Sequence, residues 1–334
     1  MIVDVKKAIL HILDCNSGAG IFSDEEMDMS DAGLNAYLTK HIEKVYDDPG
    51  IRTGEFTESS GFKYHLKEYL ADEITFAKFS LFAAERLYEN IKNSENIESC
   101  DIVVCECIIS EKRTIAVLKF DNKVGFVHHV TQQGGKITNE IINHYAILPS
   151  TSQKITHCAF IDTEDLSIRY KGKKIKIEGE SVDLIADALL ECVFDISVKE
   201  SFNAVRKIAK GVADEYGASG IETEARMKKY VKESAMAEDE INVEKVAETV
   251  FEGLVSAKQD FVDKAKEANV PEKFEMNEYV TKKVNANIRL VTDKGIEILF
   301  PSEYYEDDEN ISIINNDDGT ISVQINNINK LINK

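Results

Sequence analysis

Two very short connections within residues 101–130 limit the folds open to this chain more than any other feature. Apolar segments at residues 101–109, 113–120 and 124–130 are separated by only three residues each. Parallel strands need a crossover connection of about a dozen residues or more, so connections this short force successive strands to run antiparallel. The segments therefore predict an antiparallel meander and argue against a doubly wound parallel sheet.

Helices are expected to pack on this sheet and to complete an α+β domain over residues 1–180. The segment at residues 73–92 is apolar over most of its helical circumference, and such a helix is normally buried on several sides. The other elements expected in this domain are a strand at 5–13, helices at 31–46 and 61–70, a strand at 154–161 and a hairpin at 166–178. The predicted fold class is α+β, an antiparallel sheet with packed helices.

Residues 181–270 combine apolar stripes at helical spacing with N-capping residues, which predicts a central helical segment. Ser197 and Glu200 have the spacing of a capping box ahead of a helix at 198–216. The other expected helices are 182–194 capped by Ser181, 221–235 opened by Ser219 and Glu222, one opened by Asn242, and one opened by Ser256 and Gln259. Short apolar runs separated by turn residues predict a small β-hairpin module over residues 271–334.

Net charge limits the partners that this chain can bind. The 334 residues include 40 Lys and Arg against 60 Asp and Glu, a formal net charge of −20. DNA-binding proteins gain affinity through Lys and Arg contacts to phosphates and usually have a basic excess. Any DNA contact must therefore come from a local basic patch, or be made through a DNA-bound protein partner.

Features of export and membrane insertion are missing from the sequence. No apolar run approaches the roughly 20 residues that span a membrane, and the N-terminal segment does not fit a signal peptide. Six cysteines lie mostly in apolar segments without a CxxC pair. Cys105 and Cys107 lie two apart on an expected strand, and we expect them to pack in a core rather than bind a metal. These features predict a cytoplasmic protein with reduced thiols.

No sequence motif predicts catalysis or a cofactor. The patterns GxxxxGK[ST], GxGxxG, GxSxG and HExxH do not occur at a supporting position. His128 and His129 are adjacent, so on a strand they face opposite sides and cannot form one site. We therefore expect a non-enzymatic protein with no catalytic residue, cofactor or metal.

One alternative is a metal-dependent nuclease. Asp101 and Asp121 could hold Mg²⁺ while Lys123 stabilises an attacking water molecule. Residues 121–123 are also an ordinary turn tripeptide, which needs no catalytic explanation.

A basic hairpin is the first candidate surface for DNA. Residues 169–176 carry five cations and no acid, against the trend of the chain, and a Lys171-Gly172 turn would present them at a hairpin tip. The alternative is a solubilising edge hairpin, because lysines protect exposed strand edges. The candidate DNA-binding residues are Arg169, Lys171, Lys173, Lys174 and Lys176.

A second candidate surface lies on two helices. Cations on the helix at 198–216 gather on one side of it, and a short Gly-containing link could place the helix at 221–235 beside it. No recognition helix with base-reading residues is identifiable, and charged helix faces are often simply solvated. The candidate DNA-binding residues here are Lys199, Arg206, Lys207, Lys210, Arg226, Lys228 and Lys229.

Four segments carry a resemblance to a known family. They are FAKFSLFAAERLYENI (76–91), RTIAVLKF (113–120), FDISVKESFNAVRKIAKGVADEYG (194–217) and the run at 285–325. In these segments and in their order the chain resembles the bacterial nucleoid-associated proteins of the NdpA/YejK type. The resemblance implies association with the nucleoid and binding of DNA, and it carries over no catalytic residue.

Residues and resemblance together predict a nucleoid-associated protein that binds double-stranded DNA largely independently of sequence. An alternative is an acidic interaction protein that recruits or modulates a DNA-bound partner, with the acidic stretch at 303–309 as a candidate contact. An apolar face left exposed on the central helices would predict a homodimer.

Overall fold

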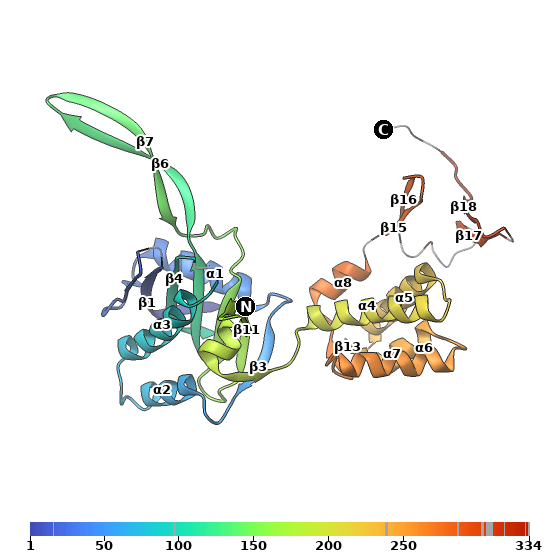
Figure 1. Cartoon of the computed structure of the whole chain (residues 1–334), viewed down its shortest axis with the longest axis horizontal. Helices are drawn as coiled ribbons and strands as arrows, with labels where there is room; N and C mark the ends of the chain where they lie inside the picture. Colours follow the sequence, from blue (N-terminus) through green and yellow to red (C-terminus); the bar gives the residue numbers. More distant parts are fainter. Residues whose placement is uncertain are drawn as a thin grey trace. The chain divides into compact units, whose positions relative to one another are not determined.

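The computed structural model describes residues 1–15, 17–95, 98–237, 240–285, 287–301, 304, 310–316, 318–330 and 332. It consists of two compact units, unit 1 at Met1–Asp195 and unit 2 at Ile196–Lys334 (Figure 1). Residues 271–334, which the sequence predicts as a separate module, are grouped with the central helices in unit 2. Among the described residues, no helix combines the length and apolar character needed to cross a membrane.

An antiparallel sheet of eight described strands forms the centre of unit 1. Its order is β12-β3-β9-β8-β5-β4-β1-β2, and every neighbouring pair is antiparallel. This arrangement confirms the predicted α+β class. The strands are β1 Val3–Asp14, β2 Ala19–Ile21, β3 Arg52–Phe56, β4 Cys100–Ile109, β5 Lys112–Asp121, β8 His157–Asp162, β9 Ile168–Lys171 and β12 Cys192–Phe194.

Helices cover both faces of the sheet, which explains why its central strands are continuous apolar runs. Ile102 and Val104 of β4 face a core shared with α2, α3 and the π-helix η1. Val103 and Cys105 face the opposite core, which is shared with α1. Cys105 and its neighbour on that face, Cys107, are both fully buried among apolar side chains. The helices are α1 Ala32–Tyr46, α2 Gly61–Leu70, α3 Phe76–Lys92 and η1 Leu184–Leu190.

The helix predicted at 182–194 is replaced by a shorter π-helix followed by strand β12. Asp183 rather than Ser181 caps η1, accepting from the N–H groups of Ile185 and Ala186 at 3.0 and 3.1 Å. Glu191 ends the helix in a left-handed conformation with φ 51°. The helix therefore ends before Cys192, and residues 192–194 can form β12 in the sheet.

The third strand of the predicted meander does not join the sheet. β6 (Lys123–Gln133) pairs with β7 (Lys136–Ile147) in a separate two-stranded ribbon, and β8 takes the position beside β5. The physical reason is burial on both faces: every residue of β8 is buried, whereas β6 carries polar side chains on both of its faces, since His128 and His129 are adjacent in the strand. Residues 124–130 therefore form a strand as predicted, but the prediction that this strand pairs with β5 was wrong.

Unit 2 begins with helices built around one apolar core. Ser197 and Glu200 form the predicted capping box of α4, and Asn242 caps α6 by accepting from the Lys245 N–H. Ser256 does not open α7, which starts one residue earlier at Val255 without a side-chain cap. The elements are α4 Val198–Glu215, α5 Gly220–Ala237, β13 Glu240–Asn242, α6 Val243–Val250, α7 Val255–Glu267, β14 Lys273–Glu275 and α8 Glu278–Val284.

Two short hairpins follow α8 and share a small apolar cluster. Their strands are β15 Ile288–Val291, β16 Glu297–Phe300, β17 Ile311–Asn315 and β18 Ile321–Ile325. A further small hairpin in unit 1 consists of β10 Lys174–Ile177 and β11 Glu180–Asp183. The C-terminal strands were predicted correctly from their apolar runs and turn residues.

Candidate nucleic-acid interface

The basic segment at residues 166–178 does not form the predicted hairpin. β9 pairs with β8 and β3 in the large sheet, whereas β10 pairs with β11 in a separate hairpin. Ile168 and Tyr170 of β9 are buried in the core of unit 1, so this strand is held in the sheet and cannot project. The hairpin prediction was wrong, and its five cations do not meet at one tip.

Two of these five cations are already occupied by contacts within unit 1. Arg169 lies over the Tyr46 ring, 4.6 Å from its centroid, and is 3.7 Å from the Asp47 carboxylate. The Lys171 ammonium is 2.9 Å from the carboxylate of Asp48. The remaining three are exposed and form no ion pair within the described residues: Lys173, Lys174 and Lys176.

Helices α4 and α5 lie side by side, as the Gly-containing link predicted. Gly217 in this link has φ +70°, a conformation that glycine adopts without strain and that ends α4. The Arg206 guanidinium of α4 donates to the Glu224 carboxylate of α5 at 2.5 Å. The two helices therefore combine their charges on one surface.

A surface groove runs along this helix pair. One part, with a volume of about 700 Å³, is lined by α4, the residues 217–221, α5 and β15. An adjoining part of about 250 Å³ shares Lys210, Gly220 and Glu224 with the first. We call the two parts together the α4–α5 groove. Its lining holds one carboxylate, Glu224, and the cations Arg206, Lys207, Lys210, Lys228 and Arg289.

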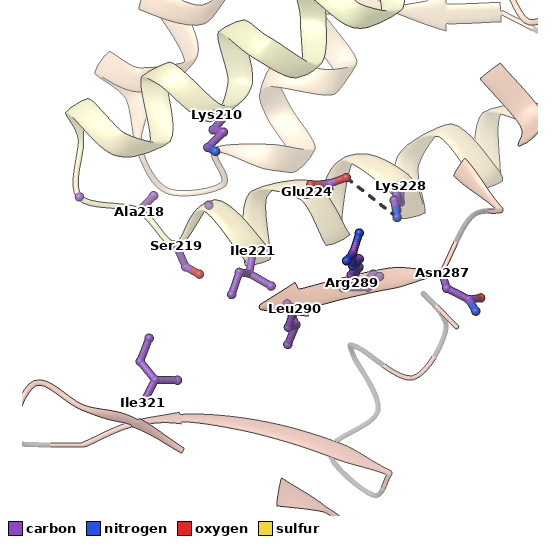
Figure 2. A pocket seen from close by; sticks show the side chains of 13 residues that line it. Lys210, Ala218, Ser219, Ile221, Glu224, Lys228, Asn287, Arg289, Leu290 and Ile321 are labelled. Carbon is purple, nitrogen blue, oxygen red and sulfur yellow. Dashed lines mark ion pairs between the residues drawn. The ribbon is translucent and has the colours of Figure 1, made fainter. Parts of the chain in front are cut away.

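The cations of the groove differ in how far they are neutralised. Lys207 and Lys210 are exposed and form no ion pair within the part of the chain that the structure describes. Lys228 is buried, with its ammonium 4.0 Å from Glu224. Burial lowers the pKa of Lys228 and Arg206 lowers it further, while the nearby Glu224 carboxylate raises it. Figure 2 shows Lys210, Glu224, Lys228 and Arg289 around the larger part of the groove.

The remaining predicted cations on these helices do not line the groove. Lys199 lies 5.7 Å from the centre of the Tyr279 ring, and Arg226 is paired with Glu222 at 2.5 Å. Lys229 is exposed on α5 outside the groove lining. Conversely, sequence reasoning missed Arg289, which reaches the groove from β15 although it pairs with Glu297. No local sequence signal marks a strand residue some 80 positions after α4 as a neighbour of that helix.

The nuclease alternative lacks its metal-binding pair. Asp121 lies opposite Cys100, the neighbour of Asp101, and successive residues of a strand point to opposite faces. Asp101 and Asp121 therefore cannot bind one Mg²⁺, and the lysine that contacts Asp121 is Lys119 rather than Lys123. Within the described residues, no group of three or more His, Cys, Asp or Glu side chains could hold a metal ion.

Asp101 instead affects stability, because it is a buried carboxylate with one oxygen that lacks a hydrogen-bond partner. Burial raises the pKa of Asp101 to about 6, so this residue favours the fold most at low pH and the benefit is lost as the pH rises through 6. We expect Asp101→Asn to raise the free energy of unfolding by about 2 kcal/mol at pH 8. The gain should disappear near pH 4. Urea denaturation of the wild type and of Asp101→Asn at the two pH values measures this gain. Equal free energies of unfolding for the two proteins at pH 8 would show that the charged Asp101 does not destabilise the fold.

The acidic stretch at residues 303–309, the candidate contact of the recruiting alternative, lies outside the described residues except for Tyr304. The structure therefore gives this stretch no geometry.

Comparison with known proteins identifies the family. The family model described as nucleoid-associated protein YejK matches residues 9–333, nearly the whole chain. The comparison with curated proteins found no match. The description of this family implies association with the nucleoid, and so with DNA. This chain therefore belongs to the YejK family of nucleoid-associated proteins.

Proposed function

We propose that this chain binds double-stranded DNA by phosphate contacts in the α4–α5 groove, largely independently of base sequence. The observation that carries the proposal is the charge of the groove lining: five cations and one carboxylate, in a chain with a net charge of −20. Lys and Arg contacts to phosphates release counterions and supply most sequence-independent affinity.

Lys207 and Lys210 are the cations best suited to a first phosphate contact. They lie three residues apart on α4, so their side chains are neighbours on one face of the helix. Both are exposed, and no carboxylate in the described residues has to be displaced before either can bind a phosphate. Their charge is therefore available to DNA at little cost.

The start of α5 adds to the attraction for anions. Residues 217–221 line the groove, and α5 begins within them at Gly220. The N-terminus of a helix carries a partial positive charge that favours a phosphate, and here the Ser219 hydroxyl already accepts from one of its N–H groups, that of Glu222. A phosphate at this point would also offset the like charges of Arg206 and Lys228, which lie near one another and share Glu224.

The double variant Lys207→Glu/Lys210→Glu tests the proposal. We expect it to lower the affinity for a labelled duplex by more than about tenfold at low salt, because two phosphate contacts are lost and two carboxylates are added. The slope of log affinity against log salt should also become shallower, by about 0.9 for each lost contact. Fluorescence anisotropy between about 50 and 200 mM salt measures both quantities.

A matched control is available on α7. Lys258→Glu/Lys266→Glu changes the net charge equally within unit 2, and neither lysine lines the groove. This control should retain nearly the full affinity. Equal losses in the two variants would mean that only overall charge matters, and the groove assignment would fail.

A third variant, Lys173→Glu/Lys174→Glu, tests the exposed cations of unit 1. If this variant alone loses affinity, the DNA contact lies on unit 1 and the groove proposal is wrong. If the purified chain does not bind the duplex even at low salt, contact through a DNA-bound protein becomes the better explanation.

A further inference from the structure

The ribbon of β6 and β7 leaves the sheet of unit 1 and projects away from it (Figure 1). Ten residue pairs hold the ribbon together, from Lys123 opposite Ile147 to Gln133 opposite Lys136. Between Phe126 and His144, every side chain that the structure describes is exposed apart from the half-buried Thr131. The ribbon therefore receives almost no support from the body of unit 1.

One face of the ribbon carries a row of exposed apolar side chains. Residues opposite each other in an antiparallel pair share a face, so Phe126 and Val130 of β6 lie on the same face as Ile137 and Ile141 of β7. Their exposed fractions are 75%, 58%, 68% and 79%. We call these four residues the apolar row. Exposed apolar groups in such a continuous arrangement mark an interaction surface.

The ribbon also has unpaired backbone edges. Within the described residues, β6 and β7 pair only with each other. A two-stranded hairpin alone is at best marginally stable in water, and stability normally requires a further strand or a packed face. A partner that covers the apolar row would supply that missing face.

We propose that the partner is a second copy of this chain and that the ribbons of two copies pack face to face. Two chains with a net charge of −20 repel each other, so they can meet only where acids are few. Residues 123–147 contain two lysines and a single acid, Glu140. The polar residues beside the apolar row include no acid: His128, Gln132, Asn139 and Asn143.

The composition of the face suits a dimer. It holds eight side chains, the apolar row and four polar residues, which lie along most of the length of the ribbon. An interface between proteins normally combines a central apolar group with polar residues around it. DNA fits the face less well, because a phosphate backbone would leave the apolar row uncovered.

The spacing of the apolar row is compatible with two-fold symmetry. Its residues alternate between the strands, in the order Phe126, Ile141, Val130 and Ile137 from base to tip. A two-fold axis across the ribbon beside Ile141 would set Ile141 against its own copy and Phe126 against Val130 of the second copy. Such a self-complementary contact is the commonest form of homodimer interface.

Sedimentation equilibrium of the full chain tests the proposal. We expect the wild type to be dimeric at about ten micromolar and Ile141→Glu to be monomeric, because two carboxylates would face each other across the axis. Val255→Glu is the matched control, since Val255 is also 79% exposed but lies on α7. It should remain dimeric. A monomeric wild type, or a dimeric Ile141→Glu, would overturn the proposal.

A cross-linking experiment does not depend on weakening the ribbon. We expect Ile141→Cys to join two chains through a short bismaleimide, and Val255→Cys to give no such product. Most native cysteines are buried, which keeps the background low. Absence of the Ile141→Cys product in a dimeric sample would place the interface elsewhere and reject the ribbon contact. The outcome is independent of DNA binding, which the groove variants test separately.

Discussion

Replacing Asp183 by alanine is expected to lower the free energy of unfolding of unit 1 by about 3–5 kcal/mol. The Asp183 carboxylate is buried and accepts from the N–H groups of Ile185 and Ala186 at the start of η1. It also pairs with the Arg52 guanidinium at 3.3 Å. Alanine would leave two N–H groups and one largely buried cation without this acceptor, and unpaired buried groups carry most of the cost.

Urea denaturation followed by circular dichroism measures this loss. Asp183→Asn should lower the free energy of unfolding by a smaller amount, because the asparagine amide oxygen can still cap η1 although the charge is gone. Asp187→Ala is a nearby control that removes a single hydrogen bond, from the Asp183 N–H to an exposed carboxylate. If Asp183→Ala lowers the free energy of unfolding no more than Asp187→Ala does, the buried ion pair contributes little to stability and the expectation is wrong.

Acid is expected to destabilise unit 1 through two buried histidines. Burial lowers the pKa of His11 to about 4, and burial together with the charge of Lys119 lowers the pKa of His157 to about 4. His11 is held as a neutral acceptor by the N–H of Ser23 at 3.2 Å, and its other ring nitrogen is 2.6 Å from the Ser80 hydroxyl. Both rings therefore fold in the uncharged form.

The direction of the pH effect follows from these values. A histidine in the unfolded chain has a pKa near 6.5, whereas His11 and His157 in the folded chain have a pKa of about 4. Their contribution to the free energy of unfolding is therefore complete above pH 6.5 and is lost as the pH falls towards 4. Between pH 6.5 and pH 4, each histidine should lower the free energy of unfolding by about 3 kcal/mol. Asp101 acts in the opposite sense there and offsets part of the loss.

Urea denaturation at pH 7 and pH 4.5, repeated with His11→Asn and His157→Asn, isolates each contribution. Each variant should lose less stability on acidification than the wild type does, because the unfolded state of the variant has one fewer group to protonate. A variant with the same pH dependence as the wild type would show that the replaced ring is not the one that titrates.

Elements with local determinants could be predicted from the sequence. The β4–β5 hairpin follows from its three-residue connection, and α4 follows from the Ser197–Glu200 box and its apolar stripe. The ribbon strand β6 was recognised as a strand, but its partner was not. Whether β6 or β8 pairs with β5 depends on which strand has two faces to bury, a comparison between distant segments.

The candidate site was predictable to the extent that it depends on helical spacing. Lys207 and Lys210 follow from the periodicity of α4, and the Gly-containing link suggested that α5 lies beside it. Neutralisation of charge could not be predicted, because Asp47 and Asp48 lie more than 100 positions before their partners Arg169 and Lys171. Counting cations in a sequence therefore overestimates the charge that is available to DNA.

The large sheet ends on both sides in strands of three residues, β2 and β12. Strands this short offer a foreign strand few backbone groups to pair with, which is a common protection against edge-to-edge aggregation. Concentrated protein should therefore resist the growth of intermolecular β-structure from this sheet. The open edges of β6 and β7 are much longer, so they offer a better starting point for such growth.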